Sequence, residues 1–165
     1  MATRKQSKRG SAQSRSRKGS GKARPAAARR SSRAGRTTAS SGAAPATFYV
    51  CRSCVWSESA RERDGKRQGT FLLEAVRDLI EAEPLPETLN LRAVYCLNGC
   101  KSPCNVGFRS AGKHHVRFSH LTPENAADVI AYARAYQANA TGEVSEDDTP
   151  TAMRGKMTVH TPPIG

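Results

Sequence analysis

The cysteines of this chain gather in two short stretches. All five lie in Cys51-Arg-Ser-Cys54 and in Cys96-Leu-Asn-Gly-Cys100-Lys-Ser-Pro-Cys104. Thiolates grouped in this way are ligands for iron–sulfur clusters and for structural zinc. A 2Fe–2S cluster contains two irons that each take two cysteines, so two loops that present two cysteines apiece fit its demand.

Four of these cysteines form two pairs, and the fifth is additional. The pairs are Cys51 with Cys54, spaced C-x2-C, and Cys96 with Cys100, spaced C-x3-C. Three roles stay open for Cys104: it replaces one of the four ligands, it stands beside them as a further thiol, or it is an inert small residue. Asn98 and Gly99 permit a tight turn whose N–H groups can face sulfur, which would raise a reduction potential.

Composition bears on where such a site would work. No stretch of the 165 residues approaches the roughly 18 consecutive apolar residues of a membrane helix. No apolar core follows the N-terminal charges, as a secretory signal would require. We therefore expect a cytoplasmic protein without membrane contact, in which clustered cysteines serve metal or redox chemistry rather than structural disulfides.

The positive charge is concentrated at the N-terminus. Residues 1–46 hold 13 of the 27 Lys and Arg residues and none of the 14 Asp and Glu residues. They contain no Leu, Ile, Val, Phe, Tyr or Trp, so we expect a disordered tail. Three roles are considered for it: solubilisation, weak and salt-sensitive contact with nucleic acid or another polyanion, and an organelle transit peptide.

A strand-like run precedes each cysteine stretch, and a helix separates the two. The runs are Thr47-Phe-Tyr-Val50 and residues 91–96. Residues 70–83 repeat apolar side chains at helical spacing, and Pro84 ends the pattern. A strand, a helix and a strand in this order predict a right-handed βαβ unit, which would bring both cysteine stretches to strand ends.

The second half of the chain predicts a hairpin and a second helix. Apolar and polar residues alternate over 106–108 and again over 116–118, with turn residues between them. Thr122-Pro-Glu124 supplies a capping hydroxyl, a proline and an acid, as a helix start requires. The order β-α-β-β-β-α predicts an α/β domain with a mixed sheet, thioredoxin-like with one of the usual middle helices missing.

These elements predict three segments. The basic tail covers residues 1–46, and the folded domain covers residues 47–140. Residues 141–165 turn acidic and end in Thr-Pro-Pro-Ile-Gly. We expect them to form an extended C-terminal segment that either wraps around the domain or stays loose.

From about Phe48 to Pro163 the chain resembles a family of small bacterial proteins of unknown function that are catalogued as predicted metal-binding proteins. The motifs that carry the resemblance are Tyr49-Val-Cys51-x-x-Cys54, Leu72-Leu73, Cys96-Leu97-x-x-Cys100-x-x-x-Cys104, and Asp128 within Ala126-Ala-Asp-Val129. That family is in turn similar to thioredoxin-like 2Fe–2S ferredoxins, including the small subunit of respiratory complex I.

The resemblance implies a ligand set and a manner of assembly. In those ferredoxins a Cys-Leu-Gly-Ala-Cys stretch after a strand supplies one ligand pair, so it favours Cys96 and Cys100 over Cys104. The first pair is closer together in this chain than in those ferredoxins, and Cys104 is therefore the substitute for Cys54. Relatives with this fold often form homodimers.

Three other interpretations use the same residues. Two cysteine pairs about 40 residues apart could hold zinc, and the basic tail would then contact nucleic acid. A C-x2-C pair after a first strand is also where thiol–disulfide oxidoreductases work, although a polar loop separates Cys54 from the helix. Mixed Cys and His ligation would involve His114, His115 or His120, but adjacent histidines point to opposite faces of a strand.

We find no pattern of ordinary enzymatic catalysis: no phosphate-binding glycine loop, no paired acids in an apolar setting, and no nucleophile with a base. The sequence therefore predicts a non-enzymatic 2Fe–2S protein, cytoplasmic and thioredoxin-like, that carries one electron for a redox partner the sequence does not identify. The expected ligands are Cys51, Cys54, Cys96 and Cys100, with Cys104 nearby.

Overall fold

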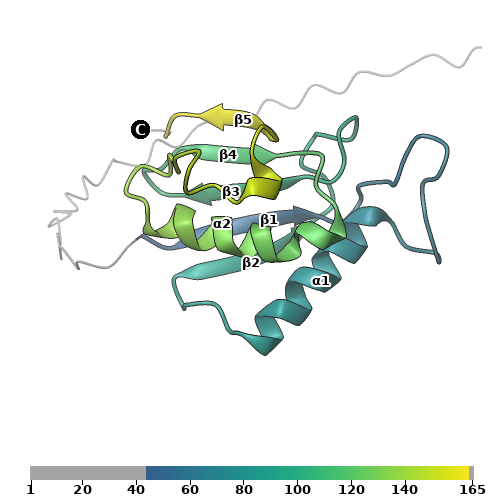
Figure 1. Cartoon of the computed structure of the whole chain (residues 1–165), viewed down its shortest axis with the longest axis horizontal. Helices are drawn as coiled ribbons and strands as arrows, with labels where there is room; N and C mark the ends of the chain where they lie inside the picture. Colours follow the sequence, from purple (N-terminus) through teal and green to yellow (C-terminus); the bar gives the residue numbers. More distant parts are fainter. Residues whose placement is uncertain (1–43, 164–165) are drawn as a thin grey trace, which may run out of the picture. The chain divides into compact units, whose positions relative to one another are not determined.

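The computed structural model describes residues 44–163, and the predicted disorder of residues 1–46 lies almost wholly outside this range. Within it, the strands and helices follow one another in the predicted order, and one additional strand follows the second helix (Figure 1). The elements are β1 (Ala46–Cys51), α1 (Gln68–Ala82), β2 (Leu89–Val94), β3 (Val106–Ser110), β4 (His115–Phe118), the 3-10 turn η1 (Pro123–Asn125), α2 (Ala126–Ala138), the 3-10 turn η2 (Thr151–Met153) and β5 (Met157–Thr161).

The five strands form one mixed sheet in the order β2-β1-β3-β4-β5. Strand β1 pairs with β2 in parallel, whereas every other pairing is antiparallel. In this register Phe48 of β1 lies between Leu91 and Phe108 of its two neighbours. The order β2-β1-β3-β4 with β3 opposed to both of its neighbours is the thioredoxin-like arrangement, so the predicted α/β class is confirmed.

Helix α1 buries one face against this sheet. Leu72, Leu73 and Val76 are buried, as the apolar spacing predicts. The helix ends before Pro84, where a proline cannot continue the hydrogen-bonded ladder. At its start Gly69 is required by space, because a Cβ there would lie 2.1 Å from the carbonyl oxygen of Cys51. The first turn of α1 therefore packs directly against the end of β1.

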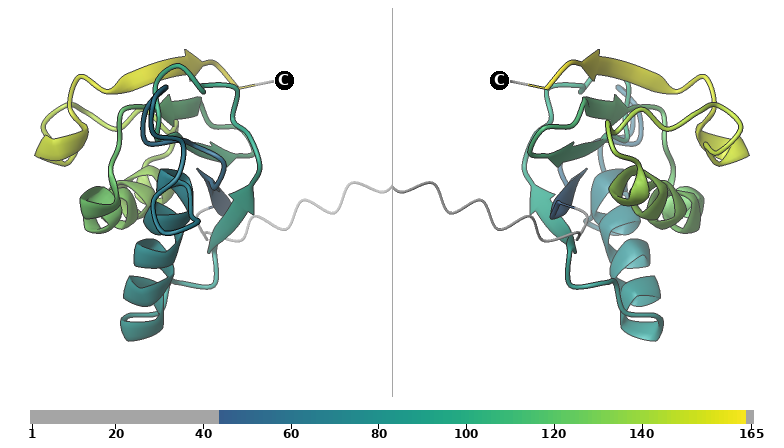
Figure 2. Two further views of the ribbon diagram at one scale, coloured as in Figure 1. Left: turned by 90° about the vertical axis from the view of Figure 1, so that its right-hand side faces the viewer. Right: turned by 90° about the vertical axis from the view of Figure 1, so that its left-hand side faces the viewer.

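Helix α2 closes the core around Phe108. The rings of Tyr132 and Tyr136 lie 4.7 Å and 5.8 Å from that ring, and Phe118 lies 6.0 Å from it. Both helices cover the same face of the sheet (Figure 2). The opposite face has no helix over it in the described residues. Neither helix in this range is long and apolar enough to cross a membrane.

Strand β5 lies within residues 141–165, which were expected to form an extended C-terminal segment beside the domain of residues 47–140. Met157–Thr161 pairs with β4 at the edge of the sheet, so this part of the segment joins the sheet as a strand. Only Val159 of this strand is half-buried, because an edge strand has little apolar surface to cover. Such a polar strand leaves no apolar alternation in the sequence.

Candidate metal centre

All five cysteines lie at one end of the sheet. Cys51 is the last residue of β1, Cys96 lies two residues beyond the end of β2, and Cys104 lies two residues before β3 begins. Because β1 and β2 are parallel and β3 is antiparallel to β1, these three positions lie at the same end of the sheet. All five are within the described residues, and none forms a disulfide.

The five thiols divide into a buried group and an exposed group. Cys51, Cys54 and Cys104 form the buried group, with at most 2% of each residue exposed. Cys96 and Cys100 form the exposed group, in the loop that joins β2 to β3. The sulfurs of this exposed pair lie 3.8 Å apart, which is contact distance without a bond.

The buried thiols lie next to one another. The pKa of Cys51 is raised far above its ordinary value, first by a hydrogen bond with Cys54 and then by burial. The pKa of Cys54 is raised to about 11, first by a hydrogen bond with Cys104, while Cys51 and Asn105 oppose the rise. Each of these thiols is therefore in the environment of another, and burial makes the loss of a proton costly.

The exposed pair reaches the buried group through Cys100. Its pKa is raised, first by a hydrogen bond with Cys96, and the charge of Cys51 adds to the rise. A raised pKa keeps the thiol of Cys100 protonated at neutral pH. A bound cation reverses this balance, because a coordinated thiol is deprotonated and its charge is compensated. The donor set is therefore matched to a positively charged centre.

The loop from Cys51 to Cys54 lies against the start of α1, although a long polar segment separates them in sequence. The backbone N–H of Gly69 donates to the carbonyl of Cys54 at 3.1 Å, and the hydroxyl of Thr70 donates to the carbonyl of Arg52 at 3.2 Å. These helix-start donors are thus used on carbonyls rather than on sulfur. The pair lacks the lowered thiol pKa on which disulfide exchange depends.

Asn105 joins the cysteine loops, and the sequence analysis did not identify it. It is 1% exposed, and its amide group donates to the carbonyls of Gly99 and Ser102 at 2.8 Å and 3.1 Å. The same nitrogen lies 3.5 Å from the sulfur of Cys54. The hydroxyl of Ser119 donates to its carbonyl oxygen at 2.7 Å. The only sequence signal was its position directly after Cys104.

The turn between Cys96 and Cys100 has the predicted tight geometry. Asn98 adopts a positive φ of 57°, and its N–H donates to the sulfur of Cys96 at 3.2 Å. Gly99 is required by space, because a Cβ there would lie 2.1 Å from the side-chain oxygen of Asn105. The glycine thus lets the exposed loop approach the buried amide.

Two further side chains hold the exposed loop, and the sequence did not identify either. Arg117 of β4 donates to the carbonyls of Leu97 and Asn98 at 2.6 Å and 3.3 Å. The hydroxyl of Ser53 donates to the carbonyl of Tyr95. Isolated polar residues of this kind repeat at no period, so the sequence gives no sign of their contacts.

The histidines do not join the thiols. His114 and His115 lie at the start of β4, and two antiparallel pairings place that start at the opposite end of the sheet from Cys51. His120 contacts the cysteine loop through its backbone N–H, which donates to the carbonyl of Ser102 at 3.3 Å.

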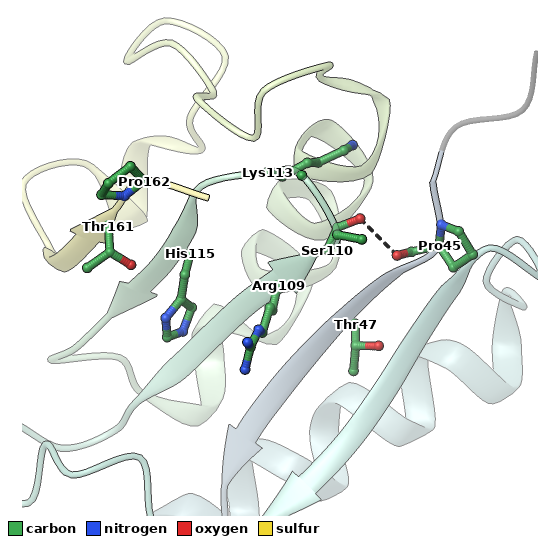
Figure 3. A pocket seen from close by; sticks show the side chains of 10 residues that line it. Pro45, Thr47, Arg109, Ser110, Lys113, His115, Thr161 and Pro162 are labelled. Carbon is green, nitrogen blue, oxygen red and sulfur yellow. Dashed lines mark hydrogen bonds between the residues drawn. The ribbon is translucent and has the colours of Figure 1, made fainter. Parts of the chain in front are cut away.

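Two concavities differ in their relation to the cysteines. One of about 450 Å³ lies at the histidine end of the open sheet face, where Figure 3 shows Arg109, His115 and Thr47 along its wall. No cysteine lines it. A smaller hollow of about 290 Å³ is lined by Cys100, Ser53, Val55, Ser57, Glu58, Arg61 and Arg67. The thiols therefore adjoin the smaller hollow, through Cys100, and not the larger one.

The fold and the site define a thioredoxin-like α/β domain with five cysteines at one end of its sheet, where Cys51 lies next to Cys54, Cys54 next to Cys104, and Cys96 next to Cys100. The chain belongs to a protein family of unknown function, DUF1636, which matches residues 48–163. No curated protein matches it.

One solved structure is similar to part of the chain. It is a thioredoxin-like [2Fe-2S] ferredoxin from Aquifex aeolicus, 19% identical, with a TM-score of 0.38; the match covers 53% of this chain and 78% of that chain. At this level of similarity, neither the fold nor the cluster of that ferredoxin can be inferred for this chain.

Proposed function

We propose that this domain holds a 2Fe–2S cluster through cysteine thiolates and acts as a small one-electron carrier. The observation that carries the proposal is that five cysteines without a disulfide, from two separate chain segments, lie at one end of the sheet.

The donor set fits two irons with two thiolates each. We propose Cys51 and Cys54 as the ligands from the first loop, and Cys96 and Cys100 as the ligands from the second. The raised pKa of Cys100 in the field of Cys51 supports a single shared site. Cys104 lies beside Cys54 and is the candidate to replace it.

The chain supplies the surroundings of this centre. Burial of the Cys51 side lowers the local dielectric, which favours a low net charge on whatever is bound there. The N–H of Asn98 and the amide of Asn105 lie at 3.2 Å and 3.5 Å from sulfur, and donors to sulfur raise a cluster's reduction potential. When bound, the cluster would supply reversible one-electron transfer.

An electron would enter and leave on the exposed side of the centre. Cys96 and Cys100 are exposed there, and Tyr95 beside them is 72% exposed. The guanidinium of Arg52 lies 3.7 Å from the centre of the Tyr95 ring. We propose this aromatic and basic surface as the place where a redox partner docks.

The test is an absorption spectrum with iron, sulfide and zinc analysis on the full-length chain, purified without oxygen. We expect visible charge-transfer bands and about two irons and two sulfides per chain. A colourless protein with about one zinc on the thiols would contradict electron transfer. It would instead favour the zinc module, with residues 1–46 contacting nucleic acid.

The ligand question needs two matched variants. Cys54→Ser and Cys104→Ser alter adjacent buried thiols, so packing losses are similar in both. We expect Cys54→Ser to lose the visible bands and Cys104→Ser to keep them. The reverse result would exchange the two roles, and loss in both would indicate that the centre draws on all three buried thiols.

A further inference from the structure

A second group of metal-binding side chains lies at the opposite end of the sheet from the cysteines. It consists of His114, Glu143 and His160, whose ligand atoms all lie within 4.8 Å of one another. The Nε2 atom of His114 is 3.8 Å from Oε1 of Glu143, and Nε2 of His160 is 3.7 Å from the same oxygen. Two imidazoles thus face one carboxylate oxygen.

Three elements bring these side chains together. His114 directly precedes β4, and His160 lies in β5, which pairs with β4. Their rings are stacked, with centroids 4.7 Å apart and planes 18° apart. Glu143 follows α2 in a turn that the side chain of Asn139 holds, because its oxygen accepts the N–H groups of Thr141 and Gly142. The strand pairing and this turn therefore fix the approach.

His114 is oriented as a metal-ligating histidine is. Its Nδ1 lies 3.1 Å from the carbonyl of Thr141, so the Nδ1–H tautomer donates there and leaves the lone pair of Nε2 towards Glu143. Its backbone N–H donates to the same carbonyl at 2.7 Å. The hydroxyl of Tyr136 donates to the carbonyl of His114 at 2.7 Å. A histidine held this way through its other ring nitrogen is typical of metal sites.

We propose that His114, Glu143 and His160 bind a divalent transition metal, with Zn²⁺ the best fit. Two histidines and one carboxylate are an established zinc ligand set, completed by a water in the fourth position. Tetrahedral coordination at zinc–ligand distances of about 2.0–2.1 Å separates neighbouring ligand atoms by about 3.4 Å. Rotation of the exposed Glu143 and His160 side chains closes the small remaining gap.

Such a site would stabilise the position of the edge strand β5. It would tie β5 and the turn after α2 to the start of β4. The large pocket lies beside it, since Figure 3 shows His115 and Thr161, the sequence neighbours of His114 and His160, on its wall. His114 and His160 do not line that pocket, so the metal site is separate from it. It is also independent of the proposed electron-carrying centre.

The test uses zinc itself on the full-length chain without an affinity tag, purified anaerobically with its cysteine centre intact. Residues 1–46 contain no Cys, His, Asp or Glu, so they add no zinc ligands. Calorimetric titration should detect one zinc equivalent beyond the cysteine centre. Long-range ¹H–¹⁵N spectra of the imidazoles should show Nε2 of His114 and His160 shifting as that equivalent binds.

The variants separate this site from the cysteines. Glu143→Gln changes an exposed side chain, and His160→Gln changes the edge strand. Each should weaken the additional equivalent by about tenfold or more while leaving the iron and sulfide content unchanged. His120→Asn is the matched control, because asparagine tolerates the positive φ of 57° at that position. Equal zinc affinity in wild type, Glu143→Gln and His120→Asn, or unshifted His114 and His160 resonances, would overturn the proposal.

Discussion

The two groups of thiols in this molecule are built by different means. Cys51, Cys54 and Cys104 are part of the hydrophobic core, at most 2% exposed and packed with it. Cys96 and Cys100 stand on an exposed loop that polar contacts from other elements hold in place. Folding of the core thus fixes one group, whereas the other depends on hydrogen bonds.

The difference indicates how a metal centre can be both stable and accessible. The buried group packs within the core of the sheet, so folding alone brings its three thiols together. The exposed group faces solvent, so under the proposed function metal and redox partner would reach the site from its side. Asn105 connects the two groups, since it contacts the sulfur of Cys54 and the carbonyl of Gly99 at once.

The largest expected effect is on bound iron. Cys51→Ser and Cys100→Ser remove one proposed ligand from the buried and the exposed group. We expect each to reduce the iron content of the anaerobically purified chain by about tenfold or more, because one of the two irons then lacks one of its two thiolates and the cluster is lost as a unit. Iron and sulfide analysis with the visible spectrum measures this.

The proposal that both thiol groups bind iron would be contradicted if only one group supplies ligands. Iron retained in Cys100→Ser but lost in Cys51→Ser would show that the exposed thiols are not ligands. His115→Gln serves as the control, since His115 lies at the opposite end of the sheet and should leave the iron content unchanged.

The next effect concerns the residue that joins the groups. Asn105→Ala removes an amide that makes two hydrogen bonds to loop carbonyls and accepts one from Ser119. Leaving these buried groups unsatisfied should lower the free energy of unfolding of the metal-free chain by about 3 kcal/mol. Urea denaturation measures it.

Asn90→Ala is the control for Asn105→Ala, because Asn90 is an exposed asparagine in β2. It should change the free energy of unfolding by less than about 0.5 kcal/mol. Equal losses in the two variants would mean that Asn105 does not connect the thiol groups energetically.

Elements with a period could be predicted from the sequence, and isolated contacts could not. Apolar residues recur about every 3.6 residues in helix α1 and about every two residues in the β3–β4 hairpin. The need to bury one face of each element produces this spacing, and the spacing can be recognised in the sequence. The location of both cysteine stretches at the same end of the sheet could be predicted, because a strand precedes each stretch. Strand β5 has one half-buried residue, Val159, and so left no pattern.

The contacts of the site depend on this unseen part of the fold. Asn105 is a single polar residue, and nothing in a sequence marks which amide bridges two loops. The cluster of His114, Glu143 and His160 exists only because β5 pairs with β4, so a missed edge strand conceals it entirely. Long-range pairing of polar segments is thus what sequence patterns failed to convey.

A smaller effect concerns pH. In the metal-free chain the pKa of Cys54 is raised to about 11, first by Cys104, against an unfolded value of about 8.5. A raised thiol pKa stabilises the fold below the unfolded pKa, and this contribution is lost as pH rises through the folded value. By pH 10 the raised pKa of Cys54 alone should lower the free energy of unfolding by about 2 kcal/mol, and the raised pKa of Cys51 adds to this fall.

Cys54→Ala tests that pH effect, because Cys54 is also the largest cause of the raised pKa of Cys51. The fall between pH 8 and pH 10 should largely disappear in this variant and persist in Cys96→Ala. Denaturant titrations at both pH values give the comparison. An equal fall in both variants would place the pH dependence outside the buried thiols.

The smallest expected effect isolates burial itself. At pH 7, Cys104→Ala in the metal-free chain should lower the free energy of unfolding by about 1–2 kcal/mol, because a fully buried sulfur leaves a small cavity. Cys100→Ala, at an exposed position, should change it by less than about 0.5 kcal/mol. Parallel urea titrations measure the two.

The same two variants distinguish a thiol that contributes to stability through burial from a thiol that binds the metal. With metal bound, Cys100→Ala should be the more damaging of the two, because it removes a proposed ligand while Cys104 stands beside the set. The order of stabilities should therefore invert between the metal-free and the metal-bound protein. If Cys104→Ala is worse in both states, Cys104 rather than Cys54 is a ligand, and the buried group contributes its thiolates in a different combination from the one proposed.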